Sequence, residues 1–329
     1  MNFWKVYYIR MPEDIRNLKF EDNGWSGCLR DKDFHFKNCT TQYKDIVTFE
    51  SLLTAWNDFI SKKRKRSDIN EYALHLSDNL FDLLNELKNS SYIHGEYDQY
   101  IICDPKKRVI HKANVKDRIV HRLVYNTLYS YFDKRYIYDS YSCRVGKGTH
   151  KAQARFRSFV NIVSKNYTKP CFVLKFDIKK CFESINKETL KLILVRHIED
   201  AILKDLVYSI IDSFPSGLPL GNLTSQLFIN VYLHEFDIYV KHLIKCPYYL
   251  RYADDIIIVH HDKKELESMY LDLQSFLKEK LHLTSHKKIV SSIYVGIDIL
   301  GLVFFPKYER LRRSTERKAK LRDIANSLE

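Results

Sequence analysis

The chain has 329 residues, of which 45% are hydrophobic and 29% charged, a balance that excludes a fibre or a disordered chain. Lysine and arginine number 54 against 41 acidic residues, and the net charge of +13 fits a polyanionic partner, such as nucleic acid or an anionic membrane, and equally an ordinary basic enzyme. Seven scattered cysteines without a CxxC pair argue against disulfides and zinc and for a reducing compartment, the cytoplasm, and no apolar run of about 18 residues predicts a membrane span.

The N-terminal part of the chain is predicted to be helical after an irregular start. Residues 1–45 show little periodicity, whereas residues 49–60 place apolar side chains on one helical face. A basic run at residues 62–66 follows, which is either a solvated helix end or a phosphate contact. Ser77 is placed to cap a further amphipathic helix.

A basic hairpin is predicted next. Residues 100–103 and 108–111 are short extended runs, and the intervening Asp104-Pro105 is good turn chemistry. A helix over residues 115–131 follows, with its apolar residues at helical spacing.

The second half of the chain predicts a sheet backed by helices. The order resembles the split βαβ or ferredoxin-like arrangement. The predicted strands are residues 171–177, 248–252, 255–259 and 289–294, and the predicted helices are residues 187–197, 201–213, 221–244 and 262–281.

Three carboxylates fall at strand ends in this scheme. Asp254 and Asp255 sit in a tight turn between two apolar runs, and Asp177 ends a buried strand. An Asp-rich turn is common by itself. If the strands are neighbours, however, the three carboxylates converge at one edge of the sheet, where hard oxygen ligands suit Mg²⁺. Two such ions can promote an in-line phosphoryl displacement.

The residues around these carboxylates resemble those of reverse transcriptases. Tyr252-Ala253-Asp254-Asp255 looks like the family's YxDD signature, and residues 176–182 look like its first metal-binding strand. Residues 140–150 and 296–301 resemble the block before that strand and the segment that closes the palm. The resemblance implies an α+β right-hand polymerase with fingers, a ferredoxin-like palm and a short helical thumb.

The resemblance also divides the chain into parts. An N-terminal extension would cover residues 1–45, the fingers 46–170, the palm 171–300 with a long helix at 221–244, and a short basic thumb 301–329.

Catalytic roles follow from the same resemblance. Asp177 and Asp254 would bridge two Mg²⁺ ions, for which Mn²⁺ can substitute, with Asp255 assisting and the Ile178 carbonyl as a further ligand. Lys287 or Lys288 would protonate the leaving pyrophosphate, and Lys288 is our candidate.

Substrate contacts are implied in the same way. Phe182 falls at the family's steric gate against the ribose 2′-hydroxyl. Deoxynucleoside triphosphate would meet Arg108, Lys112, Lys116, Arg118, Cys181, Phe182, Leu220 and Gly221. Template RNA and cDNA would meet Arg144, Lys147, Tyr252, Arg310, Arg312 and Arg313.

The block at residues 220–226 discriminates among reverse transcriptases. Many members have QGxxxSP here, whereas Leu220, Gly221, Ser225 and Gln226 give LGxxxSQ. That form resembles the enzymes of diversity-generating retroelements, which copy RNA with errors opposite adenine and work with a small basic accessory variability protein. Leu220 cannot supply the hydrogen bond of an amide, which would narrow discrimination between right and wrong pairs. Ordinary packing by Leu220 is the other reading.

Several other functions stay open. A retron, group II intron-like or defence-associated reverse transcriptase would share the chemistry. A two-metal nucleotide cyclase would not need the basic hairpin or a residue at the gate position of Phe182. A non-catalytic RNA-binding protein would not need three convergent carboxylates.

Overall fold

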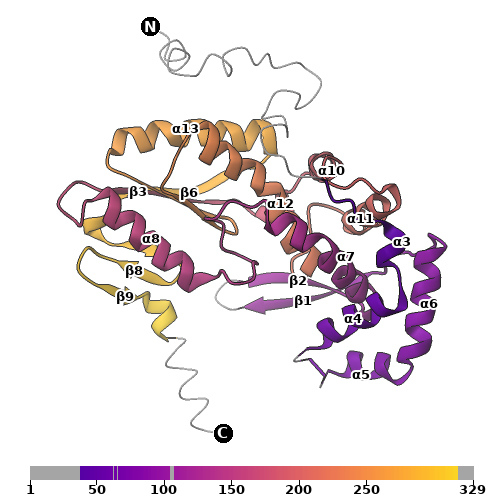
Figure 1. Ribbon diagram of the computed structural model, residues 1–329. Coiled ribbons are helices and arrows are strands. Elements are labelled where there is room, and N and C mark those ends of the chain that lie inside the picture. The colour runs from indigo at the N-terminus through magenta and orange to yellow at the C-terminus, as the bar shows by residue number, and fades with distance from the viewer. Residues whose placement is uncertain (1–37, 62, 65, 104–106, 318–329) are drawn as a thin grey trace, which may run out of the picture.

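The computed structural model describes residues 38–61, 63–64, 66–103 and 107–317 (Figure 1). The predictions for residues 1–37, for the hairpin tip at 104–106 and for the basic chain end from 318 onward lie outside the described residues. In the part that is described, no helix combines the length and apolar character needed to cross a membrane.

Helices form the N-terminal part of the described chain. Their bounds are α3 Tyr43–Ile46, α4 Phe49–Ile60, α5 Ser67–Leu74, α6 Leu76–Lys88 and α7 Val115–Asp133. Helix α4 begins where the Thr48 hydroxyl accepts a hydrogen bond from the Ser51 amide, as an N-cap should. The predicted cap Ser77 instead lies inside α6, because that helix begins earlier, after His75.

The predicted hairpin is confirmed and is longer than expected. Strands β1 (Tyr97–Cys103) and β2 (Lys107–Ala113) are antiparallel, paired from Tyr97–Ala113 to Cys103–Lys107. In Figure 1 the hairpin extends away from the bundle formed by α3 to α7.

A four-stranded antiparallel sheet forms the centre of the molecule. Its strands are β4 (Tyr249–Tyr252), β5 (Asp255–His260), β3 (Phe172–Ile178) and β6 (Ser285–Ser292), in that spatial order. Alternate residues along β3 enter two different cores, with Phe176 on one face and Val173 on the other. Helices α12 (Leu223–Ile238) and α13 (Lys263–Leu281) cover the first face, and α8 (Thr149–Val163) covers the second.

The remaining elements connect these layers. They are α9 Cys181–Ser184, α10 Lys187–Val195, α11 Ala201–Asp212, the π-helix η2 Tyr239–Leu243, the 3₁₀-helix η3 Ile293–Val295, and strands β7 Ile297–Ile299, β8 Leu302–Phe304 and β9 Glu309–Leu311.

Two boundaries differ from the sequence predictions. The helix expected at residues 221–244 begins at Leu223 and changes to π-helix at Tyr239. Strands β7, β8 and β9 form a separate antiparallel sheet, so the segment expected to begin a helical thumb is extended up to Leu311. Its strands have only three residues each, too short to show strand alternation, and a helix begins only at residue 313.

A pair of adjacent leucines tests the packing of α4. Leu52 is fully buried and Leu53 is 37% exposed on the same helix. We expect Leu52→Ala to lower the free energy of unfolding by about 2–5 kcal/mol, because it leaves a cavity. The control Leu53→Ala should change it by about 0.5 kcal/mol or less. Urea unfolding measures both; equal effects would contradict the described packing.

Candidate active site

The register of the central sheet places two of the predicted carboxylates opposite each other. Asp177 on β3 pairs directly with Asp255 on β5. Directly opposed residues of an antiparallel pair point to the same face with their Cβ atoms about 5 Å apart. Their face is the one packed against α8, because Val173 and Ile257, which alternate in phase with them, lie in that core.

The third carboxylate lies in the turn that joins β4 to β5. Ala253 has a left-handed φ of +53°, which reverses the chain within two residues. The carbonyl of Asp254 accepts a hydrogen bond from the Ile178 amide at 3.3 Å. The turn is therefore tied to the end of β3. Asp254 directly precedes Asp255, which faces Asp177.

Two lysines offset this negative charge. Lys287 Nζ lies 3.5 Å from Asp177 Oδ2, and Lys175 Nζ lies 4.0 Å from Asp255 Oδ1. Burial raises the pKa of Asp255; the Lys175 ammonium opposes this, and the carboxylates of Asp254, Asp177 and Asp298 raise it further. The site therefore holds more negative charge than its lysines neutralise, which favours cation binding.

The oxygen donors fit a hard divalent cation. The Oδ1 atom of Asp177 is buried and has no hydrogen-bond partner among the described residues. A buried oxygen without a partner costs free energy unless a ligand or an ion binds to it. Within the described ranges, however, no three His, Cys, Asp or Glu side chains are already grouped to bind one metal ion. The expected convergence thus holds for Asp177 and Asp255 as a facing pair, with Asp254 as their neighbour at the turn.

The two candidate lysines of β6 lie at a β-bulge. The register shifts opposite residues 175–177, and Lys287 has a left-handed φ of +50°. Lys287 consequently reaches Asp177. Lys288, our candidate for the general acid, has its ammonium 4.5 Å over the Tyr270 ring. Tyr270 packs against Phe176 on the opposite face of the sheet, so Lys288 is not brought to the carboxylates.

Most of the expected triphosphate-binding cations are already paired. Lys112 and Arg118 both contact the carboxylate of Asp68, at 2.9 and 2.5 Å, and Lys116 contacts Glu86 at 2.9 Å. Burial alone would raise the pKa of Asp68, but hydrogen bonds from Lys112 and Arg118 outweigh it and lower the pKa to about 2. Arg108 is exposed on β2.

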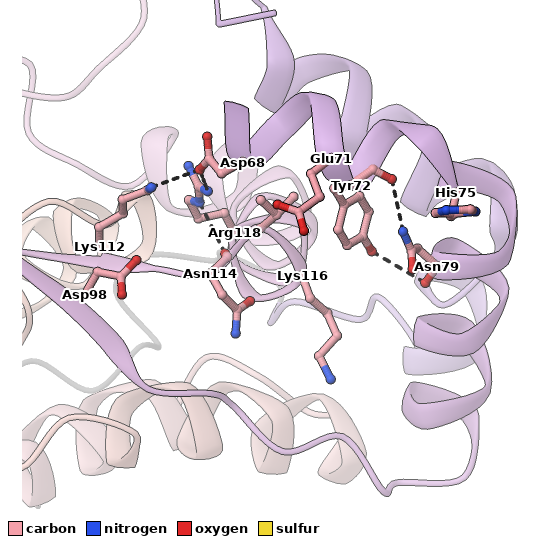
Figure 2. A pocket seen from close by; sticks show the side chains of 11 residues that line it. Asp68, Glu71, Tyr72, His75, Asn79, Asp98, Lys112, Asn114, Lys116 and Arg118 are labelled. Atoms are coloured by element: carbon pink, nitrogen blue, oxygen red, sulfur yellow. Dashed lines mark hydrogen bonds and ion pairs between the residues drawn. The ribbon is translucent and has the colours of Figure 1, made fainter. Parts of the chain in front are cut away.

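Lys112, Lys116 and Arg118 line a pocket of about 480 Å³ between β2, α5, α6 and α7 (Figure 2). Figure 2 shows Lys112 and Arg118 converging on Asp68, while Lys116 points elsewhere. Asp98 and Glu71 also line the pocket, so its charge is mixed. A phosphate group could use Lys112 and Arg118 only by displacing Asp68.

The block at residues 220–226 is docked on the hairpin. The His111 amide donates to the Leu220 carbonyl at 2.9 Å, and the Asn222 side chain donates to the His111 carbonyl at 3.0 Å. Gly221 has a φ of +115°, and a Cβ there would lie 2.6 Å from Ile110 Cγ2. Glycine at this position therefore permits the close approach of β2.

The rest of that block is built into α12. Ser225 is buried and Gln226 is half-buried. The Thr224 hydroxyl is hydrogen-bonded to His121 Nδ1 at 2.5 Å, and burial lowers the pKa of His121 to about 3. His121 belongs to α7, so this contact is a second link between the block and the helices beside the hairpin.

The candidate gate lies against the start of the same segment. The half-buried Phe182 accepts a hydrogen bond at its carbonyl from the Leu218 amide at 2.8 Å. Its neighbour Cys181 is buried, and burial, together with the Asp254 carboxylate, raises the pKa of its thiol. Cys181 and Phe182 are therefore positioned between strand β3 and the 217–221 segment.

The expected nucleic-acid contacts differ in how exposed they are. The Arg144 side chain is only 6% exposed, and its guanidinium donates to Asp133 and to the Ile137 and Ser140 carbonyls, so it serves the fold. Lys147 lies 3.5 Å over the Tyr138 ring. The Tyr252 hydroxyl accepts from Thr149 at 3.1 Å. Arg310, Arg312 and Arg313 are exposed, and Arg312 contacts Asp298 at 3.3 Å.

Sequence reasoning missed two charged residues of the site. Lys175 lies two positions before Asp177 and therefore on the same face of β3, which strand alternation could have indicated. Arg251, directly before the predicted signature, is fully buried, and nothing in the local sequence distinguished it from a surface arginine.

The chain matches the sequence pattern of one known protein family. The sequence pattern described as "Reverse transcriptase (RNA-dependent DNA polymerase)" matches residues 103–304, more than half of the chain. The chain belongs to the reverse transcriptase family.

One curated relative and several solved structures are similar to it. The "Putative COX1/OXI3 intron 2 protein" of Saccharomyces cerevisiae is 20% identical over 277 residues, covering 63% of this chain and 30% of that protein. Telomerase from Candida tropicalis with the TWJ fragment of telomeric RNA matches with a TM-score of 0.51 and 13% identity, over 67% of this chain and 45% of that chain. Telomerase from Candida albicans with the same type of fragment matches at 0.49 and 11%, over 68% and 48%.

The likeness to the Candida tropicalis telomerase, with a TM-score of 0.51, supports the fold alone. The chain spans less than half of the telomerase chains and under a third of the intron protein. The α+β right-hand polymerase architecture is nevertheless shared, in agreement with the antiparallel sheet and the helices that flank it.

Glycine-to-alanine variants test the docking of the hairpin. Gly221 and Gly148 have similar positive φ angles of +115° and +112°, but only Gly221 has atoms within 4 Å of an added Cβ. We expect Gly221→Ala to speed hydrogen exchange at the His111 amide by at least about tenfold, because β2 must move away. The control Gly148→Ala carries the same backbone strain and should leave that amide unchanged. Equal exchange in both variants would argue against the contact.

Proposed function

We propose that this protein is an RNA-directed DNA polymerase that makes cDNA from template RNA by two-metal phosphoryl transfer. The observation that carries the proposal is the pairing of Asp177 with Asp255 next to the turn residue Asp254, in a chain of the reverse transcriptase family. A cyclase or a non-catalytic RNA-binding protein would share parts of this surface, but neither needs the hairpin docked on residues 220–222.

The aspartates and one backbone carbonyl would hold the metal. Asp177 and Asp254 would hold two Mg²⁺ ions, which would supply charge neutralisation for phosphoryl transfer. Asp255 assists, and the Ile178 carbonyl completes the donor set. Rotation of the Asp254 side chain would gather the three carboxylates without moving the strands, because the backbone of the turn is tied to β3.

The nucleotide would lie between the sheet and the hairpin. Phe182 presses against C2′ of the sugar and rejects a 2′-hydroxyl. Arg108, which is exposed on β2, would meet the triphosphate, with Lys112, Lys116 and Arg118 contributing once their carboxylates release them. Lys287, 3.5 Å from Asp177, is better placed than Lys288 to donate a proton to pyrophosphate.

Template and primer would run along the basic and aromatic side chains outside this centre. Tyr252, Lys147 and the arginines at 310, 312 and 313 are the proposed contacts. We retain the division into fingers, palm and thumb as a proposal, with the thumb beginning after β9. A small basic accessory variability protein is a further proposed partner.

For the biological role we propose an adenine-mutagenic enzyme of a diversity-generating retroelement. The support is Leu220, whose backbone is fixed by His111 while its side chain has no polar atom. The correct base pair then loses a hydrogen bond that an amide could give. Each loss of about 1.4 kcal/mol in the free-energy difference between correct and incorrect pairs raises the relative rate of misincorporation about tenfold.

A second candidate is an enzyme of the group II intron type. The similarity to the intron 2 protein of Saccharomyces cerevisiae favours it, at 20% identity. This candidate predicts ordinary errors at template adenine, so fidelity separates the two roles.

Loss of one carboxylate tests the polymerase proposal. We expect Asp177→Asn and Asp254→Ala to abolish primer extension on RNA, because each removes a proposed metal ligand, while RNA affinity stays within about twofold. Primer extension and filter binding at fixed salt measure the two quantities. Full extension by either variant would contradict the metal assignment.

Substitution of Leu220 tests the retroelement role. Leu220→Gln restores an amide, and we expect misincorporation opposite template adenine to fall by about tenfold. Sequencing of cDNA made on one RNA template measures it, with errors opposite the other three bases as internal control. An unchanged error spectrum would show that Leu220 is not the cause.

A further inference from the structure

A fully buried arginine lies directly before the catalytic turn. Arg251 belongs to β4 and is 0% exposed. Strand alternation places it on the α12 face of the sheet, with Tyr249 and away from Asp255. It is among the largest completely buried side chains in the described part of the chain.

Every N–H group of this guanidinium has an acceptor. Nε donates to Asp237 Oδ1 at 2.8 Å, and Nη2 donates to Asp237 Oδ2 at 2.7 Å and to Ser140 Oγ at 3.2 Å. Nη1 donates to Asn230 Oδ1 and to the carbonyl of Ala253, both at 3.1 Å. Five donors in a rigid fork match these five bonds, which a lysine ammonium could not reproduce.

The anion of this pair is equally fixed. Asp237 lies on α12 with 0% exposure and also accepts the Tyr249 hydroxyl at 2.5 Å. Asn230, on the same helix, donates its own amide to the Ser142 carbonyl at 3.0 Å. The position of the guanidinium is therefore set by α12 and by the segment around Ser140.

The bond to Ala253 is the one that reaches the site. Ala253 adopts a left-handed φ of +53°, a conformation that costs free energy for a residue with a Cβ. Its carbonyl accepts a hydrogen bond from Arg251. The next carbonyl, that of Asp254, accepts one from the Ile178 amide at 3.3 Å. Two consecutive peptide groups of the turn are thereby fixed, one from each side of Asp254.

We propose that Arg251 is a positioning residue that holds the Ala253–Asp254 turn in the conformation needed to bind divalent cations. The inference rests on the proposed polymerase function, and it adds a residue that touches neither metal nor substrate. Its contacts with Asn230 and Asp237 also connect the turn to the helix that begins with the 220–226 block.

Two variants and one control test this on the full chain. Arg251→Lys keeps the charge beside Asp237 but loses the fork. The double variant Arg251→Met/Asp237→Leu removes both charges, a replacement that buried ion pairs often tolerate in folding. The control is Arg196→Lys, which alters an ion pair between Arg196 and Glu235 on the same helix, away from the turn.

The readout is Mn²⁺ binding followed by electron paramagnetic resonance, with thermal unfolding recorded in parallel. We expect both Arg251 variants to fold and to bind Mn²⁺ roughly 10- to 100-fold more weakly, because they lose support behind the metal ligands. The control should bind as the unaltered protein does. Wild-type affinity in a folded Arg251 variant would overturn the proposal.

Failure of both variants to fold would also overturn it, since Arg251 would then serve the fold and not the turn. Mn²⁺ binding is measured without polymerisation, so this result is distinguishable from failure of the proposed function, which appears as absent primer extension by the unaltered protein.

Discussion

The antiparallel register between β3 and β5 is the constraint on which the site depends. It places Asp177 opposite Asp255 and leaves the turn with Asp254 at the same end of the sheet. A slip of one residue would turn Asp177 toward the α12 face and bring Phe176 out of its core. Register is fixed here because both faces of β3 are covered, each by its own apolar cluster. Burial of the sheet thus determines where the charges emerge.

Charge is managed differently on the two faces of this sheet. On the face of the carboxylates, Lys175 and Lys287 stand 3.5–4.0 Å from them at partly exposed positions, so they can yield to a cation. On the other face, Arg251 and Asp237 are wholly buried and bonded to each other. Exposed pairs of this kind contribute little to stability, whereas an interrupted buried pair is costly. The partly exposed lysines therefore lie on the same face as the candidate carboxylates, and the fully buried pair lies on the opposite face, behind the turn.

The sequence predicted the parts whose patterns are local. The hairpin expected at residues 100–111, the strand ending near Asp177 and the paired strands around Asp254 carried short extended or apolar runs and turn residues. Helix α8 was not predicted, and β7 to β9 are too short to show a period. Contacts between separate elements could not be read from the sequence. The bulge brings Lys287, not the expected Lys288, to Asp177, and the buried Arg251 donates to Asp237 on α12 and to Ser140, 111 positions away. Partners of charged residues depend on tertiary contacts, which one sequence does not reveal.

The proposed polymerase activity depends on cations that the aspartates of β3 and of the β4–β5 turn bind together. Crystals of the protein grown with Mn²⁺ and a non-hydrolysable deoxynucleoside triphosphate, measured at the manganese absorption edge, locate such ions directly. We predict anomalous density within about 2.0–2.6 Å of oxygens from both Asp177 and Asp254. Density bound by only one of these residues, or none at this edge of the sheet, would contradict it.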